Sequence, residues 1–429
     1  MMERYSEYKE SGVKWLGEIP SHWEVKRLGS FFSERKEKVS DQDYAPLSVT
    51  KQGIFPQLEN VAKTNDGDNR KLVKEGDFVI NSRSDRKGSS GVSELDGSVS
   101  LINLVLQPRK TIFGPFCNYL LKSYGFIEEN YRNGRGIVAD LWTTRYNEMK
   151  MIKVAMPSLE EQKTISSYLD TATSEIDKAI AMQQKMIDLL NERKQIIIQN
   201  AVTKGLDENV EMKESGVEFV NEIPHNWPTR RLKFSAWIRA RLGWKGLKAS
   251  EYVENGYPFL SAFNIENDHM KWNNLNFINK YRYDESPEIK LKVGDLLLVK
   301  DGAGIGKCAR IDKLPYGEST ANGSLAVITS YDMLDYRYLY YFMVSKSFKD
   351  HTELLINGMG VPHFTQGEMK KIVMPVPPQA EQQQIVTYLD GEMEKFDSAI
   401  TNCQRQITLL KERKQIIINE VVTGKVRVS

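Results

Sequence analysis

The chain has 429 residues, a length typical of two or three domains that each bury a core. With 40% hydrophobic and 27% charged residues, the composition excludes a disordered or collagen-like chain. Lys and Arg number 59 against 57 Asp and Glu, so the net charge of +2 neither indicates nor excludes a nucleic-acid partner. No apolar run reaches the ~18 residues of a membrane span, and three scattered cysteines predict neither disulfides nor a zinc site, so we expect a cytoplasmic protein.

Two segments of the sequence occur twice. ESGVKWLGEIPSHWEVKRL at residues 10–28 returns as ESGVEFVNEIPHNWPTRRL at residues 214–232, an offset of 204. NERKQIIIQNAVTKG at residues 191–205 returns as KERKQIIINEVVTGK at residues 411–425, an offset of 220. Because the offsets differ by 16, the sequence is a duplication with two inserts of unequal length.

The first repeat contains an Ile-Pro-x-x-Trp motif, with Trp23 in one copy and Trp227 in the other. Proline fixes φ and removes a donor, so the motif predicts an extended entry segment held by a buried indole. We interpret it as a structural clasp.

The inserts, residues 33–155 and 237–372, predict mixed α/β units. In the first insert we expect strands at residues 77–82 and 98–106 and a helix at residues 114–126. A Gly-Asp turn precedes the strand at 77–82, and another precedes a predicted strand at residues 295–300 of the second insert. One fold with divergent surface loops is therefore expected for both.

Long helices are predicted after each insert, starting near Pro157-Ser158 and Pro377-Pro378. Apolar residues at alternating steps of four and three form a heptad seam in each helix. The seam contains Ile165, Leu169, Ala172, Ile176, Ala179, Met186, Leu190 and Ile197, then Ile385, Leu389, Phe396, Ala399, Leu410 and Ile417. A single helix of this length cannot bury its stripe, so we expect the two copies to form an antiparallel coiled coil; a homodimeric coiled coil is the alternative.

The predicted fold class is α+β with an internal pseudo-two-fold repeat. The expected boundaries are a first globular domain at 1–157, a central helix at 158–204, a second globular domain at 205–376 and a distal helix at 377–429.

Motifs for enzymatic chemistry are lacking. The sequence Asp301-Gly-Ala-Gly-Ile-Gly-Lys307 lacks the spacing and the following helix of a P-loop, and it fits a strand-to-strand turn better. The five histidines are dispersed, and the sequence has no GxSxG motif, no acidic nuclease cluster and no Asn-Pro-Pro-aromatic signature of amino-methyltransferases. We therefore expect no catalysis, metal or cofactor in this chain.

Basic and hydroxyl side chains collect in the predicted loops of the inserts. Such loops suit phosphate contacts by Lys and Arg and base-edge hydrogen bonds by Arg, Thr and His, although each residue taken alone fits a solvated surface equally well. The candidate DNA-binding residues are Arg83, Arg86, Lys87, Arg135, Thr144, Arg145, Arg239, Arg241, Lys245, Lys300, Lys307, His363 and Thr365.

This arrangement of motifs resembles the specificity subunit of type I restriction–modification systems. The two ESGV…IP…W segments, the two ERKQIII helix ends, and MPSLEEQKTISSYLD with its counterpart VPPQAEQQQIVTYLD carry the resemblance, which covers the whole chain. It implies that each globular domain is a target recognition domain reading one half of a bipartite double-stranded DNA site. It also implies that the helix pair sets the distance between the half-sites.

The resemblance further implies two methyltransferase subunits docked on the helices, bringing S-adenosylmethionine, and restriction subunits that use ATP and Mg. Because the inserts differ, we expect an asymmetric target. Two other functions remain open at this point: a self-contained DNA methyltransferase, and a coiled-coil adaptor that binds no DNA.

Overall fold

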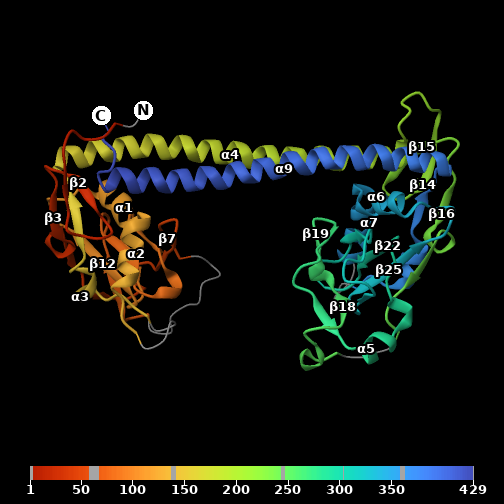
Figure 1. The fold of residues 1–429 in the computed structure, drawn as a ribbon, viewed down its shortest axis with the longest axis horizontal. Coiled ribbons are helices and arrows are strands. Elements are labelled where there is room, and N and C mark those ends of the chain that lie inside the picture. The colour runs from red at the N-terminus through yellow and green to blue at the C-terminus, as the bar shows by residue number, and fades with distance from the viewer. Residues whose placement is uncertain are drawn as a thin grey trace. The chain divides into compact units, whose positions relative to one another are not determined.

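The computed structural model describes residues 3–57, 67–136, 142–242, 247–302, 304–357 and 363–428. The chain divides into two compact units: unit 1 contains residues 1–184 and 404–429, and unit 2 contains residues 185–403. The long helices α4 (Leu159–Lys204) and α9 (Gln379–Val422) each contribute one part to both units (Figure 1). The unit boundaries thus fall inside both helices, whereas the predicted boundaries place each helix in a segment of its own.

In unit 1, two antiparallel sheets with strand orders β10-β9-β12-β4 and β11-β8-β5 form the globular part, and β1-β2, β3-β13 and β6-β7 are two-stranded. The elements are β1 (Tyr8–Glu10), β2 (Glu18–Pro20), β3 (Glu24–Arg27), β4 (Phe32–Glu34), β5 (Lys38–Val39), β6 (Leu47–Val49), β7 (Ile54–Pro56), β8 (Arg70–Val73), β9 (Phe78–Asn81), β10 (Ser90–Val92), β11 (Gly97–Val99), β12 (Asn103–Pro108), β13 (Lys153–Met156), α1 (Gly114–Lys122), α2 (Tyr124–Arg132) and α3 (Tyr146–Met149), with 3-10 turns at Leu28–Ser30 and Ser84–Arg86.

Unit 2 has a matching four-stranded sheet, β17-β25-β22-β23, and a three-stranded sheet, β21-β18-β24, in which β18 and β24 are parallel. The pairs β14-β15, β16-β26 and β19-β20 are two-stranded. Its elements are β14 (Met212–Val217), β15 (Val220–Pro224), β16 (Thr229–Arg231), β17 (Ala236–Arg239), β18 (Tyr257–Leu260), β19 (Ile265–Glu266), β20 (His269–Met270), β21 (Asn276–Ile278), β22 (Asp295–Val299), β23 (Cys308–Arg310), β24 (Thr320–Ala321), β25 (Leu325–Ser330), β26 (Val373–Pro375), α5 (Lys280–Asp284), α6 (Tyr336–Val344), α7 (Lys346–Asn357) and α8 (Gln366–Lys371), with 3-10 turns at Leu232–Phe234, Ala249–Glu251, Ala262–Asn264 and Pro287–Ile289.

Strand alternation separates the core of each globular part into two layers. Phe78 and Ile80 of β9 join the cluster that contains α1, whereas Val79 between them faces the cluster shared with the second sheet. Leu296 and Leu297 of β22 divide in the same way in unit 2. Because successive strand residues point to opposite faces, one buried strand serves both layers.

The predicted strands at 77–82 and 295–300 are confirmed as β9 and β22. The single strand predicted at 98–106 is wrong, because a turn closed by Asn103 N–H donating to Ser100 O separates β11 from β12. The single helix predicted at 114–126 is wrong as well. It breaks at Ser123, whose hydroxyl oxygen accepts from Phe126 N–H and caps α2, an interaction that competes with continuing the helix.

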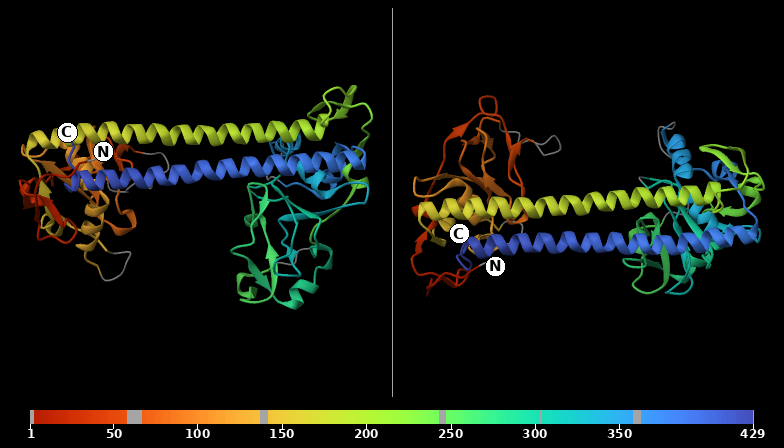
Figure 2. Two further views of the ribbon diagram at one scale, coloured as in Figure 1. Left: turned by 45° about the horizontal axis from the view of Figure 1, so that its top comes forward. Right: turned by 90° about the horizontal axis from the view of Figure 1, so that it is seen from above.

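The two long helices lie side by side and antiparallel within each unit, as the heptad seam predicted (Figures 1 and 2). In unit 1, Lys414 Nζ of α9 lies 2.6 Å from an Asp177 carboxylate oxygen of α4. In unit 2, Lys194 Nζ of α4 lies 2.7 Å from Asp397 of α9. The offset of 220 relates Asp177 to Asp397 and Lys194 to Lys414, so the two ion pairs are copies of each other.

Ten of the fourteen predicted seam residues lie in or against the unit cores: Ile165, Leu169, Ile176, Leu410 and Ile417 in unit 1, and Leu190, Ile197, Ile385, Leu389 and Phe396 in unit 2. Met186 does not, because it is 50% exposed while its neighbour Ile187 is 7% exposed. An α-helix advances 3.6 residues per turn, so a strict seven-residue repeat drifts by about 20° per heptad, and the buried position moves to the next residue.

The predicted clasp has the same geometry in both units. Trp23 and Trp227 are 0% exposed. Their indole N–H groups donate to Glu161 Oε1 (3.0 Å) and Glu381 Oε2 (2.9 Å), in the first turns of α4 and α9. Acidic residues suit this position because of the helix dipole, and the Trp bond fixes where the extended segment meets the helix. Among the described residues, no helix is both long and apolar enough to cross a membrane.

Candidate nucleic-acid interface

In unit 1, three loops that are distant in the sequence meet where β9 ends. Ser82 N–H donates to Ile102 O (3.3 Å), and Thr144 N–H donates to Ser82 O (3.0 Å). Thr143 forms β-bridges with both Arg83 and Arg135. We call residues 82–83, 101–102, 135 and 142–144 loop cluster 1. It gathers basic residues that the sequence placed in separate loops.

Exposed cations surround loop cluster 1. The exposed arginines are Arg83, Arg86, Arg135 and Arg145. Of these, Arg135 has its Nε 3.6 Å from Glu148 Oε1. Lys87 pairs with Glu128 at 2.7 Å and lies 4.4 Å from the centre of the Tyr131 ring. A small pocket lined by Arg83, Lys87, Tyr131 and Trp142 opens beside them. Cations and aromatic faces in this arrangement are suited to nucleic acid.

Thr144 does not belong with these exposed groups. It is buried, and its hydroxyl donates to Asn130 O (2.8 Å) in α2. Its role is to hold loop cluster 1 against the helix, so we withdraw it from the candidate DNA contacts.

Unit 2 builds a second cluster with the same backbone bonds. Lys300 N–H donates to Ser324 O (2.9 Å), and Phe364 N–H donates to Lys300 O (2.8 Å). Asp301 forms a β-bridge with His363. We call residues 300–301, 323–324 and 363–364 loop cluster 2. Each of its bonds has a counterpart in loop cluster 1, so the two clusters occupy the same place in the repeated fold.

The charged groups of loop cluster 2 are linked. Lys300 Nζ lies 2.6 Å from Asp301 Oδ2, and His363 Nδ1 contacts Asp301 Oδ1.

The glycine-rich turn that follows leads from β22 into β23, and Gly302 and Gly306 there have φ of +86° and +88°. This confirms a strand-to-strand turn, because no helix follows the glycines as a P-loop requires. Lys307 at the end of the turn is exposed.

Two other candidates in unit 2 have internal partners. Arg239 is buried and its Nη2 lies 2.8 Å from Asp295 Oδ2, an ion pair that Arg35 and Asp77 repeat in unit 1 at 2.7 Å. Arg241 is largely buried and pairs with Glu285 at 3.2 Å. Burial of a charge requires such a partner, so these two arginines stabilise the fold and we withdraw them.

Thr365 begins α8 instead of standing in an open loop. Its hydroxyl oxygen accepts from Glu368 N–H, and the Glu368 carboxylate accepts from Thr365 N–H, which makes a capping box. We withdraw Thr365 for this reason. Lys245 lies outside the described residues.

The sequence reasoning missed Asp301 as a site residue. The offset of 218 between Asp77 and Asp295, carried forward along both strands, aligns Asp301 with Arg83 and would have marked it. Among the described residues, no group of three or more His, Cys, Asp or Glu side chains could hold a metal ion.

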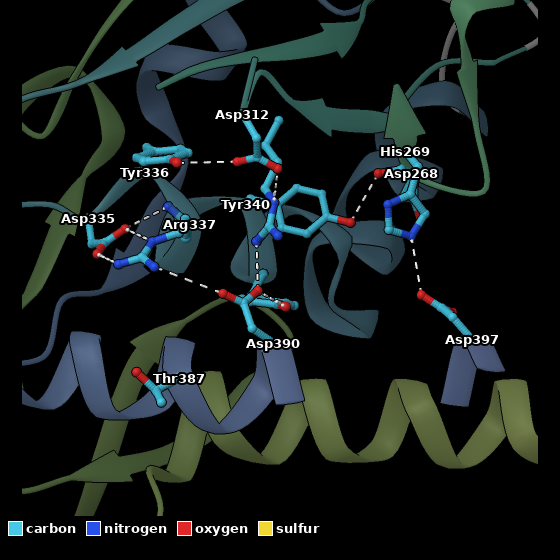
Figure 3. Close-up of polar contacts among 12 residues, drawn as sticks. Asp268, His269, Asp312, Asp335, Tyr336, Arg337, Tyr340, Thr387, Asp390 and Asp397 are labelled. Carbon is cyan, nitrogen blue, oxygen red and sulfur yellow. Dashed lines mark hydrogen bonds and ion pairs between the residues drawn. The ribbon is translucent and has the colours of Figure 1, made fainter. Parts of the chain in front are cut away.

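Polar contacts attach each globular part to its long helix. In unit 1, the Tyr119 hydroxyl donates to Asp170 Oδ1 (2.6 Å) of α4. In unit 2, the Tyr341 hydroxyl donates to Asp390 Oδ1 (2.6 Å) of α9, and Arg310 donates to the same oxygen at 2.8 Å (Figure 3). Burial, and then the hydrogen bond to Asp170, raises the pKa of Tyr119 to about 12. Burial and Asp390 raise the pKa of Tyr341 in the same order.

Figure 3 also shows His269 of β20 beside Asp397 of α9, with Nε2 3.7 Å from the carboxylate that Lys194 pairs with. Loss of hydration, and then the positive charge of Lys194, lowers the pKa of His269. Polar groups of α9 therefore hold the globular part of unit 2 at several points.

Comparisons with known proteins agree with this architecture. The family model described as "Type I restriction modification DNA specificity domain" matches residues 243–411. The chain is 26% identical over 435 residues to the type I restriction enzyme MjaVIII specificity subunit of Methanocaldococcus jannaschii, covering 98% of this chain and 97% of the relative. It is 24% identical over 454 residues to the putative type I restriction enzyme MjaX specificity subunit of the same organism, covering 98% of each.

Among solved structures, a chain reported under "Structural basis underlying complex assembly and conformational transition of the type I R-M system" shares the fold. The TM-score is 0.71 at 16% identity, covering 94% of this chain and 98% of the other. Over nearly its whole length the chain is therefore similar to type I restriction enzyme specificity subunits, the resemblance that its repeated motifs predicted.

Proposed function

We propose that the chain reads a bipartite double-stranded DNA site, with loop cluster 1 contacting one half-site and loop cluster 2 the other. The observation that carries this proposal is the repeated backbone bonding of the two clusters, Ser82 to Ile102 and Thr144, and Lys300 to Ser324 and Phe364. Duplicated loops with different side chains suit two half-sites of different sequence. The target is therefore asymmetric.

The exposed cations around the clusters position the DNA backbone. Arg86, Arg135 and Arg145 in unit 1 and Lys307 in unit 2 are placed to pair with phosphates. Each phosphate contact releases a counterion, so the DNA affinity of the assembled complex should fall steeply with salt. Replacement of one such cation by Ala should weaken binding to all sequences and make the salt dependence shallower.

The helix pair sets the spacer between the half-sites. Insertion of seven residues into α4 and seven into α9, at matched positions, adds ~10 Å of helix, or about three base pairs. The methylated motif of such a variant should have a correspondingly longer gap. An unchanged gap would show that the helices do not set the spacer.

Two methyltransferase subunits dock on the helices. Leu189 and Ile196 of α4 are 50% and 51% exposed, and their counterparts Leu409 and Ile416 of α9 are 47% and 55% exposed. The residues of each pair lie seven apart and so share one helix face. Exposed apolar faces mark partner surfaces, and a duplicated pair provides two equal sites.

In this assembly the chain itself is the non-catalytic subunit of a cytoplasmic complex. S-adenosylmethionine belongs to the methyltransferase partners, and ATP and Mg belong to the restriction subunits that join them. The groups that the two units assemble are suited to binding, because their charged side chains pair with one another or face outward as donors and acceptors.

The decisive experiment maps N6-methyladenine across the host genome with and without this gene. Loss of one asymmetric, gapped motif is expected, and the motif reveals both half-sites and the spacer. An identical map in both strains, despite a purified complex with methyltransferase subunits, would overturn the proposal. Exchange of residues 237–372 for the insert of a relative should then change one half-site and leave the other intact.

A further inference from the structure

The two loop clusters have different hydrogen-bonding groups at equivalent positions. Arg83 follows β9 and Asp301 follows β22, each six residues after the aspartate of the Gly-Asp turn. The β-bridge partner is Thr143 for Arg83 and His363 for Asp301. One backbone arrangement therefore presents a guanidinium in unit 1 and a carboxylate–imidazole pair in unit 2.

Arg83 can only donate hydrogen bonds. A guanidinium has five N–H donors in a planar fork and no acceptor, and the fork matches the O6 and N7 acceptors of guanine in the major groove. Arg83 is exposed and lines the pocket that contains Tyr131 and Trp142. The fork is therefore accessible to a ligand that offers two acceptors.

In loop cluster 2, Asp301 decides which nitrogen of His363 can accept. An ionised carboxylate only accepts hydrogen bonds, so Nδ1 of His363, which contacts Asp301 Oδ1, must have the hydrogen. In the neutral imidazole the lone pair then lies on Nε2. Lys300 Nζ, 2.6 Å from Asp301 Oδ2, holds the carboxylate in place.

The exposed fraction of the side chain increases from Lys300 through Asp301 to His363. The side chains of Lys300, Asp301 and His363 are 14%, 33% and 49% exposed. The imidazole is therefore the group that a ligand meets first, while Lys300 and Asp301 support it from inside. A support of this kind fixes both the ring orientation and the tautomer.

We propose, resting on the proposed function, that Arg83 and His363 determine one base pair in each half-site. Arg83 donates to guanine in the half-site of unit 1. His363 Nε2 accepts from an exocyclic amine, N6 of adenine or N4 of cytosine, in the half-site of unit 2. Asp301 is a positioning residue that acts through His363.

The test uses the full chain produced with its methyltransferase partners and compares Arg83→Ala, His363→Ala and Asp301→Asn. Arg83→Ala should relax a single G·C pair in one half of the methylated motif. His363→Ala and Asp301→Asn should both relax the same base pair in the other half, because an amide at 301 can donate or accept and no longer fixes the tautomer. Discrimination at each pair should fall roughly 10- to 100-fold.

Base analogues identify the atoms. Binding of the wild-type complex should weaken when 7-deazaguanine replaces the guanine, and when an analogue without the amine (purine for adenine or 2-pyrimidinone for cytosine) is placed opposite His363. The Arg83→Ala complex should be insensitive to the first replacement and the His363→Ala complex to the second. Additive penalties in variant and analogue would overturn the assignment.

Two controls lie outside the clusters. His351→Ala removes a second carboxylate-bound histidine of unit 2, whose Nδ1 lies 2.7 Å from Glu218, and Arg4→Ala removes an exposed arginine of unit 1. Both should leave the motif unchanged. If His363→Ala lowers the melting temperature, the isosteric Asp301→Asn variant still decides.

The inference is wrong if the variants keep the wild-type motif, or if Asp301→Asn and His363→Ala relax different base pairs. Absence of any gene-dependent motif in the wild type would overturn the proposed function instead, so the two failures are distinguishable.

Discussion

The two units attach their globular parts to the long helices through the same aspartate of the repeat. The aspartate accepts hydrogen bonds from a different set of side chains in each unit. Asp170 accepts from Tyr119, whereas Asp390 accepts from both Tyr341 and Arg310. The helix residue and the tyrosine are common to both units, and the arginine is an addition of the second insert. Duplication has thus preserved the anchor on the helix while the inserts changed what else contacts it.

The loop clusters at the candidate interface likewise combine repeated contacts with different side chains. Their main-chain bonds repeat, because Ser82 and Lys300 each donate to one loop and accept from another. Their side chains differ, since Arg83 stands where unit 2 has Asp301. Backbone geometry is common to both units, whereas the side chains that this geometry supports differ, which is what the proposed reading of two different half-sites requires.

The largest expected effect tests whether the clasps are equal. Trp23→Ala and Trp227→Ala should each destabilise their own unit by about 3–5 kcal/mol, because a fully buried indole is replaced by a cavity. Chemical denaturation with limited proteolysis reports which unit opens. Trp237→Ala, at a half-exposed indole, is the control and should cost less than about 1 kcal/mol. A clasp that tolerates Ala would show that the units are not equivalent.

The next largest effect is expected at the exposed apolar faces of α4 and α9. Leu409→Ser with Ile416→Ser, and Leu189→Ser with Ile196→Ser, should each weaken one methyltransferase site by about 2 kcal/mol, or ~30-fold, because apolar contact area is lost. Calorimetric titration should then show one weak and one unchanged site. Met182→Ser is a matched control, since Met182 is exposed but its counterpart is Asn402. Unequal effects of the two double variants would favour asymmetric docking.

A smaller difference is expected at the anchors. Asp390→Asn should destabilise unit 2 by about 1–2 kcal/mol, since Arg310 then loses one of its two carboxylate partners and retains Asp312. Asp170→Asn should cost unit 1 about 0.5–1 kcal/mol, the size of one weakened hydrogen bond. Tyr119→Phe and Tyr341→Phe provide matched controls that remove the tyrosine hydroxyl and leave the aspartate in place. Equal effects of the two Asn variants would contradict the added role of Arg310.

The smallest effect is a pH dependence at the unit 1 anchor. The pKa of Tyr119 is raised to about 12, above the value near 10 of an unfolded tyrosine. A raised pKa means that the folded state holds the proton more tightly, so this contribution to stability is complete below pH 10 and is lost between pH 10 and about 12. Phenolate absorbance should show Tyr119 titrating late, and Tyr119→Phe should remove that component.

The repeated parts of this protein could be predicted from local sequence patterns. Heptad spacing and the Pro-Ser and Pro-Pro starts predicted where both long helices begin to within two residues, and the Ile-Pro-x-x-Trp motif predicted the clasp. These features depend on residues close together in the chain, or on a period that the helix itself imposes. The duplicated Gly-Asp turn located β9 and β22 for the same reason.

Which polar residues face outward could not be predicted, because it depends on long-range packing. Arg239 and Arg83 both lie among basic residues in the sequence, yet Arg239 is buried on Asp295 and Arg83 is exposed in loop cluster 1. The difference arises from partners more than fifty residues away, which no local pattern reveals. Burial of a charge depends on whether a distant carboxylate is brought within reach, and packing of the whole unit determines that.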